Sequence, residues 1–232
     1  MPAVDSGKPI SIFLDLQGAS ARLRFALRVS VLLWAAALTS WLTHADTAIF
    51  QSLEANRMLK TIHPFLESFS ERGLFIFYLS FLALLTLGIL KKNVLFRTIG
   101  FAYVFAQLFG TALLVRLIKL GSGRPRPHAS YLQDAFFQVT HFAQAIHSSF
   151  PSSHAVDAAV GAVFLGVLLR SRTASILALA AAFLIALARV LIGKHYMSDV
   201  LAALALGAGI VGVAMHIYLL PRWRKIESGP TQ

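Results

Sequence analysis

The amino-acid sequence predicts an all-α polytopic membrane protein whose single domain, residues 1–232, is a bundle of six transmembrane helices. Hydrophobic residues make up 57% of the chain and charged residues 13%, and the mean hydropathy is +0.70, far above that of a soluble domain. The apolar residues also gather into runs that approach the roughly 20 residues a helix needs to cross a bilayer. We therefore expect the chain to be embedded in a membrane.

Six such runs follow one another along the chain, and the second and fourth are the shortest. The last three carry many Gly and Ala residues, which let neighbouring helices pack closely in lipid. The predicted spans are about 25–43, 74–90, 98–118, 155–170, 173–192 and 199–219.

The distribution of basic residues predicts the topology. The formal net charge of +11 raises nucleic acid as a partner, but 12 of the 21 Lys and Arg residues fall in segments that share one side of a six-span bundle. Cytoplasmic segments of membrane proteins carry such an excess. We therefore expect cytoplasmic termini, a bacterial inner-membrane location and no nucleic-acid partner.

The segments outside the spans predict less. The first 21 residues lack the long apolar stretch of a cleavable signal peptide, so we expect the first span to be an uncleaved anchor. Residues 44–73 predict one or two short amphipathic helices on the outer surface, with a plain solvated connector as the alternative. The chain has no cysteine, which excludes disulfides and thiolate metal sites.

The first polar cluster is KLGSGRPRP, residues 119–127, directly after the third span. It brings Lys119, Arg124 and Arg126 together on a stretch that Gly and Pro hold extended. Cations on a stiff loop suit a multiply charged oxyanion, because Arg meets phosphate with a two-pronged hydrogen bond. The alternative is a basic turn that contacts lipid headgroups.

The second cluster is SSFPSSHAVDAAV, residues 148–160, which opens the fourth span. Pro151, Ser152 and Ser153 are residues that begin helices, and a helix start directs free backbone N–H groups at an anion. His154 follows in the first turn, where it can transfer a proton. The alternative is a simple helix cap with an interfacial His.

The third cluster is ARVLIGKHYMSDV, residues 188–200, between the last two spans. His195 and Asp199 are four residues apart, so they share a face and can hydrogen-bond if the sixth helix begins near His195. A carboxylate that supports an imidazole makes it a competent base or nucleophile. Arg189 lies at the end of the preceding helix, where snorkelling to the interface is the alternative role.

Together the three clusters follow the order K-x6-R-P, P-S-x-H and R-x5-H-x3-D. This order resembles the signature of the type 2 phosphatidic acid phosphatase (PAP2) superfamily, which comprises membrane lipid phosphatases and vanadium-dependent haloperoxidases. Ser153 replaces the Gly of the usual P-S-G-H, and Ala188 replaces the Ser that usually precedes the Arg. Neither change removes a group that makes or breaks a bond, so they bear on substrate choice more than on activity. The matching residues are Lys119, Arg126, Pro127, Pro151, Ser152, His154, Arg189, His195 and Asp199.

The resemblance implies a role for each residue. His195 would attack phosphorus to form a phosphohistidine, Asp199 would orient its ring, and His154 would protonate the leaving group. The equatorial phosphate oxygens would be held by Lys119, Arg126, Arg189 and the amides of Ser152 and Ser153. Arg124 matches no motif position and is expected to contribute only secondary electrostatics.

No metal or other cofactor is expected, because three cations and helix-start amides can neutralise a phosphate. A zinc site built from His128, His141, His147 or His154 is the alternative, although the spacings match no familiar pattern.

The expected substrate is a lipid phosphate that reaches an extracytoplasmic site from the surrounding membrane lipids. The loop 128–150 has no Lys or Arg and several Phe, so it either lines an acyl-chain portal or packs on the bundle. Phosphatidic acid, phosphatidylglycerol phosphate, a polyprenyl diphosphate and lipid A phosphates all fit a hydrolase of this kind. The alternatives are a lipid phosphotransferase that uses the same His, and a non-enzymatic anion or lipid transporter.

Overall fold

A computed structural model describes residues 14–15, 17–129 and 147–227 of the chain, and within these ranges the protein is a helical bundle without a β-sheet. The predicted all-α fold class is confirmed. In chain order the helices are α1 Ala19–Leu42, α2 Ala45–Glu54, α3 Arg57–Arg72, α4 Phe75–Leu90, α5 Val94–Phe105, the π-helix η1 Ala106–Leu114, α6 Val115–Ser122, the short 3₁₀ helix η2 Pro127–Ala129, α7 Ser153–Leu168, α8 Arg172–Leu191, α9 Met197–Ala214, the π-helix η5 Met215–Leu219 and α10 Leu220–Glu227.

Five helical stretches of the described chain are long and apolar enough to cross a membrane, and they correspond to five of the six predicted spans, to within one residue at the C-terminal ends of the first and fifth. The remaining predicted span, 155–170, forms α7, which has only 16 residues. Helix α7 contacts α1, α4, α8, α9 and η1. Because other helices surround it, α7 does not have to match the thickness of the lipid. The five long stretches are Ala19–Leu42, Arg57–Leu90, Val94–Ala129, Arg172–Leu191 and Met197–Trp223.

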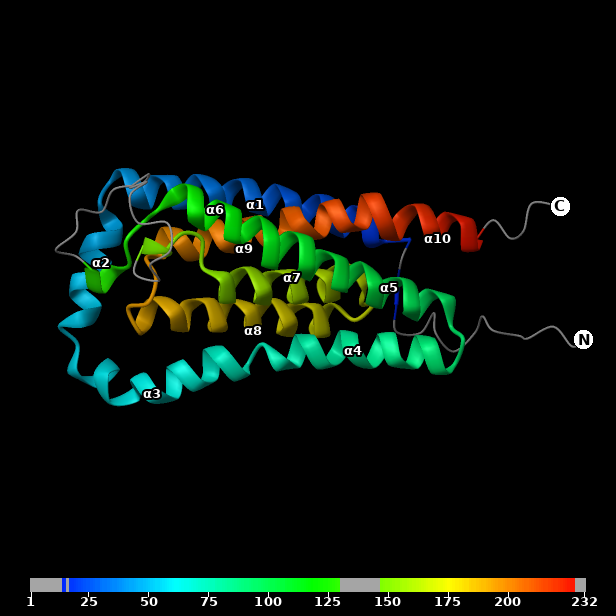
Figure 1. The fold of residues 1–232 in the computed structure, drawn as a ribbon, viewed down its shortest axis with the longest axis horizontal. Coiled ribbons are helices and arrows are strands. Elements are labelled where there is room, and N and C mark those ends of the chain that lie inside the picture. Colours follow the sequence, from blue (N-terminus) through cyan, green and yellow to red (C-terminus); the bar gives the residue numbers. More distant parts are fainter. Residues whose placement is uncertain (1–13, 16, 130–146, 228–232) are drawn as a thin grey trace, which may run out of the picture.

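The helices run along one long axis, and α2 lies across one end of the bundle (Figure 1). Both ends of the described chain lie at the opposite end (Figure 1). The chain therefore passes along the bundle an even number of times, with α7 as one of six passes. An isolated bridge between Leu14 and Leu169 joins the start of the chain to the end of α7.

The buried interior centres on α7. Val156, Val160 and Phe164 are each fully buried on this helix. Phe164 meets the edges of Phe81 and Tyr103, whose own rings stack with centroids 3.9 Å apart. This packing fixes α7 against α4 and α5, so the N-terminus of α7 has a defined position at the end of the bundle that α2 crosses.

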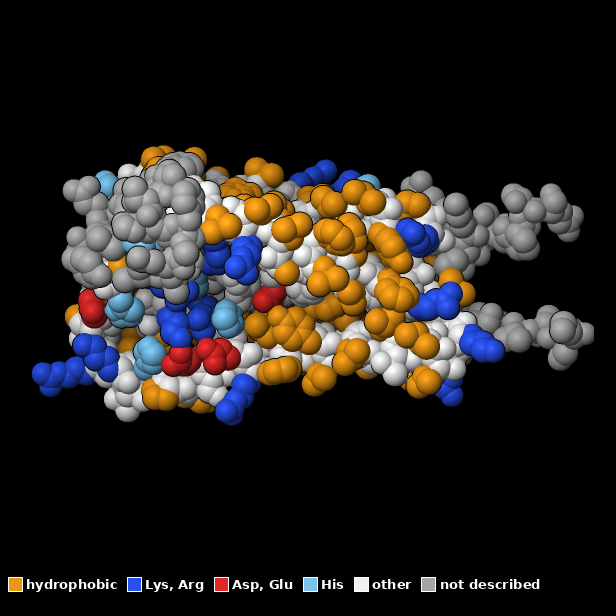
Figure 2. Space-filling view, in the orientation of Figure 1, with side chains coloured by type: hydrophobic (Ala, Val, Ile, Leu, Met, Phe, Trp, Pro, Cys, Tyr) orange, Lys and Arg blue, Asp and Glu red, His pale blue; other side chains and the backbone are white. Residues whose placement is uncertain are grey.

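The outer surface is apolar over most of its length. Large hydrophobic side chains such as Phe25, Leu32, Leu82, Leu108 and Ile176 are each more than half exposed. Figure 2 shows hydrophobic side chains over the middle of the molecule and charged ones toward both ends. This distribution matches a lipid-facing belt between two polar interfaces, and the protein is an integral membrane protein.

Candidate active site

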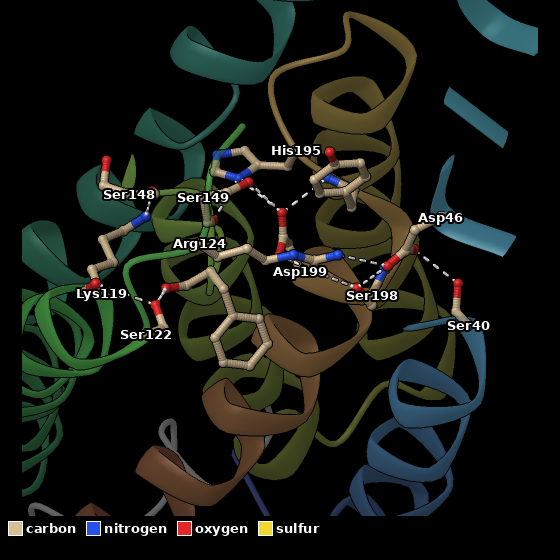
Figure 3. Close-up of polar contacts among 12 residues, drawn as sticks. Ser40, Asp46, Lys119, Ser122, Arg124, Ser148, Ser149, His195, Ser198 and Asp199 are labelled. Atoms are coloured by element: carbon tan, nitrogen blue, oxygen red, sulfur yellow. Dashed lines mark hydrogen bonds and ion pairs between the residues drawn. The ribbon is translucent and has the colours of Figure 1, made fainter. Parts of the chain in front are cut away.

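The sequence-predicted site residues come together at the end of the bundle opposite the described chain ends. Six segments supply them: the end of α6, the loop that follows it, the start of α7, the end of α8, the loop before α9 and the first turn of α9. Figure 3 shows Lys119, Arg124, His195 and Asp199 grouped around Ser148 and Ser149. The tertiary structure thus joins three motifs that lie as many as 80 residues apart in the sequence.

His195 lies in a tight turn between α8 and α9. Gly193 has φ +67°, a left-handed conformation that favours glycine. The turn brings the amides of Lys194 and His195 back to the carbonyl of Arg189, at 3.1 and 3.3 Å. The same turn therefore sets the distance between the imidazole and the Arg189 backbone.

The His195 imidazole is almost fully buried, and its Nδ1 lies 2.8 Å from the backbone carbonyl of Ser149. A carbonyl can only accept a hydrogen bond, so Nδ1 carries the proton and Nε2 keeps a lone pair. Burial lowers the pKa of His195 to about 4, so the ring is neutral at physiological pH. Nε2, on the far side of the ring from Asp199 (Figure 3), has the electronic state of a nucleophile.

Asp199 supports this imidazole differently from the sequence prediction. Helix α9 begins at Met197, two residues after His195, and Nδ1 of His195 is 3.7 Å from Oδ2 of Asp199, longer than a hydrogen bond. The predicted direct hydrogen bond is therefore wrong, because the Ser149 carbonyl takes its place. Asp199 Oδ2 instead accepts from the hydroxyl of Ser149 at 2.5 Å and from the amide of Tyr196 at 2.9 Å. Ser149 contacts both groups and links the carboxylate to the ring.

Arg124, expected to contribute only secondary electrostatics, pairs with carboxylates inside the protein. Its side chain is fully buried and donates to Asp199 Oδ1 at 2.7 Å, Ser198 Oγ at 2.7 Å and Asp46 Oδ2 at 2.9 Å. Its guanidinium also lies 4.3 Å from the ring centroid of Tyr196. The charge of Arg124 is thus directed at two buried carboxylates, and this network fixes the first turn of α9 (Figure 3).

Asp46 is the member of this network that the sequence did not indicate. It lies in the first turn of α2, is 1% exposed, and accepts from Ser40 Oγ at 2.8 Å and from the amide of Ser198 at 2.9 Å. The prediction of one or two short helices in 44–73 is confirmed, as α2 and α3, but the solvated-connector alternative is wrong at Asp46. No local pattern separates Asp46 from Glu54 or Glu67 in the same segment, so only its burial identifies it.

Three cations, Lys119, Arg126 and Arg189, lie near one another at this end of the bundle, and Lys119 and Arg126 are near His195. Lys119 donates to the Ser148 carbonyl at 2.6 Å, and Arg189 donates to Ser70 Oγ at 3.1 Å. Lys119, Arg126 and Arg189 are close enough to influence one another electrostatically. Like charges held this close repel, and a bound anion would relieve that repulsion.

Several polar atoms in these segments are buried without a hydrogen-bond partner in the described part of the chain. Among the described residues, Arg126 Nε, Arg189 Nε and Ser152 Oγ are buried without a hydrogen-bond partner. Buried donors are rarely left unpaired in native structures, and these three come from three separate segments. Unpaired donors of this kind suit a ligand with several acceptor oxygens.

The start of α7 contributes to this site with one change from the prediction. Ser152 is the N-cap residue, and its amide donates to the carbonyl of Asp199 at 3.3 Å, so it serves the fold rather than an anion. The amides of Ser153 and His154 belong to the first turn, where an α-helix has no acceptors of its own. The His154 side chain is half-buried, near Arg189, Lys194 and His195.

The histidines of the zinc alternative do not assemble into a described site. In residues 14–15, 17–129 and 147–227, no three His, Cys, Asp or Glu side chains converge as they would around a metal ion. His128 packs against the ring of Phe50 with centroids 5.3 Å apart. His141 lies outside the described residues.

A groove of about 970 Å³ opens beside the site and runs from Lys119 and Ser153 past Thr111 and Asp157 to Tyr78. The residues around it belong to α4, η1, α6 and the start of α7. The site can therefore hold a tetrahedral anion next to a neutral imidazole, and the groove can hold a long apolar group attached to that anion.

Comparisons with known proteins agree with this geometry. Two lipid A 1-phosphatases, from Rhizobium etli and Rhizobium johnstonii, are each 35% identical to the chain over 106 and 107 residues, which is 46% of this chain. The alignments span less than half of those relatives, 45% and 43% of their lengths. A transmembrane PAP2 type phosphatidylglycerolphosphate phosphatase from Bacillus subtilis shares the fold, with a TM-score of 0.55, 21% identity and coverage of 90% of this chain and 98% of that one. The sequence model of the PAP2 superfamily matches residues 95–223, more than half of the chain, and this protein belongs to that superfamily.

Proposed function

We propose that this protein is an integral membrane phosphatase that removes a phosphate group from a lipid through a phosphohistidine on His195. The observation that carries the proposal is the state of the His195 imidazole. Its Nδ1 proton is held by the Ser149 carbonyl, so Nε2 keeps its lone pair, and the Nε atoms of Arg126 and Arg189 have no hydrogen-bond partner among the described residues. A nucleophile near cationic donors that can bind phosphate oxygens is the arrangement that phosphoryl transfer requires.

The proposed reaction has two steps. In the first, Nε2 of His195 attacks phosphorus, the bond between phosphorus and the lipid oxygen breaks, and His154, in its protonated imidazolium form, gives a proton to that oxygen and becomes neutral. In the second, His154 takes a proton from a water molecule that attacks phosphorus, the phosphorus–nitrogen bond breaks, and inorganic phosphate leaves. Lys119, Arg126 and Arg189 stabilise the charge on the equatorial oxygens in both steps.

Asp199 and Arg124 act at a distance from phosphorus. The Asp199 carboxylate stabilises the positive charge that His195 acquires during attack, through the Ser149 hydroxyl and at 3.7 Å from the ring. Arg124 holds Asp199 in position from the opposite side. The chain's own cations supply the charge needed at the phosphate, so we propose a metal-independent reaction.

The groove supports a lipid as the substrate. It begins at Lys119 and Ser153 and continues along apolar residues such as Leu108 and Ala112, which could hold an acyl chain while the phosphate lies at the site. The two relatives named lipid A 1-phosphatase and the fold similarity to a phosphatidylglycerolphosphate phosphatase favour a phosphomonoester of a membrane lipid.

We also propose that the site faces the periplasm of a bacterial inner membrane and that both termini are cytoplasmic. Lys91, Arg97, Arg170 and Arg172 cluster near the end of the bundle opposite the site, as the positive-inside rule requires. Since the chain has no cysteine, single cysteines at Lys60 and Lys91, both exposed, test this topology. An impermeant thiol reagent added to intact cells should label K60C and spare K91C, and the reverse pattern would overturn the orientation.

The function is tested by phosphate release from lipid phosphates in detergent with EDTA present. Wild type should release phosphate, and His195→Ala should not. His216→Ala is the matched control, because His216 lies in η5, outside the site. Acid-labile labelling from a ³²P-lipid should be trapped in wild type and absent in His195→Ala. Loss of activity in EDTA would refute the metal-independent step, and label transfer to a second lipid with little free phosphate would identify a phosphotransferase.

A further inference from the structure

Farther along α7 from the proposed phosphate position, the groove is lined by polar side chains. Asp157 lies on α7, four residues after Ser153, which is one helical turn or about 6 Å farther along the helix. Thr111 and Gln107 line the groove opposite it, together with Tyr78. The hydroxyls of Tyr78 and Thr111 are the polar neighbours of the Asp157 carboxylate.

Asp157 differs from the other acidic side chains near the site. Asp46 and Asp199 pair with Arg124, Glu67 pairs with Lys194, and Glu71 lies 3.9 Å from Arg189. Asp157 has no ion pair within the described part of the chain. A carboxylate without a cation in a membrane-spanning segment is costly, so its presence there points to a function.

The opposite wall is built by a π-helix. Residues Ala106–Leu114 form η1, and π-helical segments concentrate at functional sites. A Cβ on Gly110 would lie 2.3 Å from Cγ2 of Ile210, so glycine allows η1 to pack closely against α9. This packing fixes Gln107 and Thr111, on η1, at the groove.

The polar side chains that line the groove mostly accept hydrogen bonds. Gln107 donates its side-chain amide to the Tyr103 hydroxyl at 2.8 Å, which leaves its side-chain carbonyl to accept. The Asp157 carboxylate accepts as well. Thr111 Oγ1 is buried without a hydrogen-bond partner among the described residues. A group that binds here should therefore donate a hydrogen bond.

We propose that Asp157, Thr111 and Gln107 form a second recognition site that selects lipid phosphates with an N–H or O–H donor close to the phosphate ester. The inference rests on the proposed phosphatase function. If the phosphate lies at the start of α7, a hydrogen-bond donor on the second lipid carbon from the ester oxygen would lie beside Asp157. An amide on that carbon is favoured, whereas the ester of a diacylglycerol phosphate offers only acceptors.

The test compares ceramide 1-phosphate, which has amide and hydroxyl donors at this position, with phosphatidic acid of matched chain length. In mixed micelles we expect wild type to have the higher kcat/KM on ceramide 1-phosphate. Asp157→Ala should lower the ratio of the two kcat/KM values by about tenfold or more, as for loss of a hydrogen bond to a charged group. Leu117→Ala, an exposed apolar position of α6 outside the groove lining, is the control and should leave the ratio unchanged.

The outcomes separate this inference from the proposed function. A wild-type enzyme that hydrolyses phosphatidic acid but not ceramide 1-phosphate, or an Asp157→Ala enzyme with the wild-type ratio, would overturn the second site and leave the phosphatase intact. A wild type that releases phosphate from neither lipid would overturn both. If Asp157→Ala does not fold, Asp157→Asn keeps the size of the side chain, and its amide N–H should shift the ratio toward phosphatidic acid.

Discussion

Arg124 and Arg126 are two residues apart, yet the structure predicts opposite consequences of replacing them. Arg124 is fully buried and makes three hydrogen bonds to Asp46, Ser198 and Asp199. Arg126 is half-buried, has no ion pair among the described residues, and its Nε has no partner. We therefore expect Arg124→Met to reduce stability and Arg126→Met to reduce phosphate binding.

The size of the effect follows from the charges left behind. Arg124→Met would leave the carboxylates of Asp46 and Asp199, 1% and 0% exposed, without their cation. Removing one partner of a buried ion pair costs about 3–5 kcal/mol, which for a chain of this size corresponds to a fall in Tm of about 10 °C. Arg126→Met removes one of three mutually repelling cations, so its Tm should equal or exceed that of wild type.

Thermal unfolding followed by tryptophan fluorescence in detergent, combined with phosphate-release kinetics, tests this prediction. Arg126→Met should lower kcat/KM by about 100-fold, as for loss of one charged stabiliser of the transition state. The double variant Arg124→Met/Asp46→Asn removes one of the two stranded charges and should recover part of the lost stability. A Tm of Arg124→Met within 2 °C of wild type, or an equal loss in Arg126→Met, would refute the assignment.

Three further predictions concern the nucleophile and its support. Ser149→Ala keeps the carbonyl that binds His195 but removes the hydroxyl that donates to Asp199, so kcat should fall about tenfold with little change in KM; an unchanged kcat would show that Ser149 does not act through Asp199. Burial holds the pKa of His195 near 4, against an ordinary 6.5. The unfolded state therefore binds a proton more readily than the folded state, so the free energy of unfolding should be highest above pH 6.5 and decline as pH falls from 6.5 toward 4. His195→Gln should flatten this dependence of Tm on pH, and an identical slope in the variant would refute the assignment. Ser152→Ala removes a buried hydroxyl without a partner, so it should leave Tm unchanged or higher while raising KM for the lipid phosphate, and a lower Tm would show that the hydroxyl serves the fold.

Sequence patterns were informative wherever the relevant property is local. Runs of apolar residues predicted the helices, because the length and composition of a helix are properties of one continuous segment. Motif spacing predicted that Lys119, His154 and His195 meet at one end of the bundle. The prediction failed where a contact depended on backbone detail: the Ser149 carbonyl, rather than Asp199, binds His195 Nδ1.

The sequence by itself determined the all-α membrane bundle, the three motifs and the nature of the chemistry they can perform, since each depends on residue type and spacing. Only the tertiary structure decided which charges face the substrate and which hold the fold. Arg124 meets Asp46 across 78 residues, and Ser149 meets Asp199 across 50. Whether a charged side chain is buried beside a partner or left beside a groove depends on where distant segments pack, and burial sets the strength of every electrostatic interaction at the site.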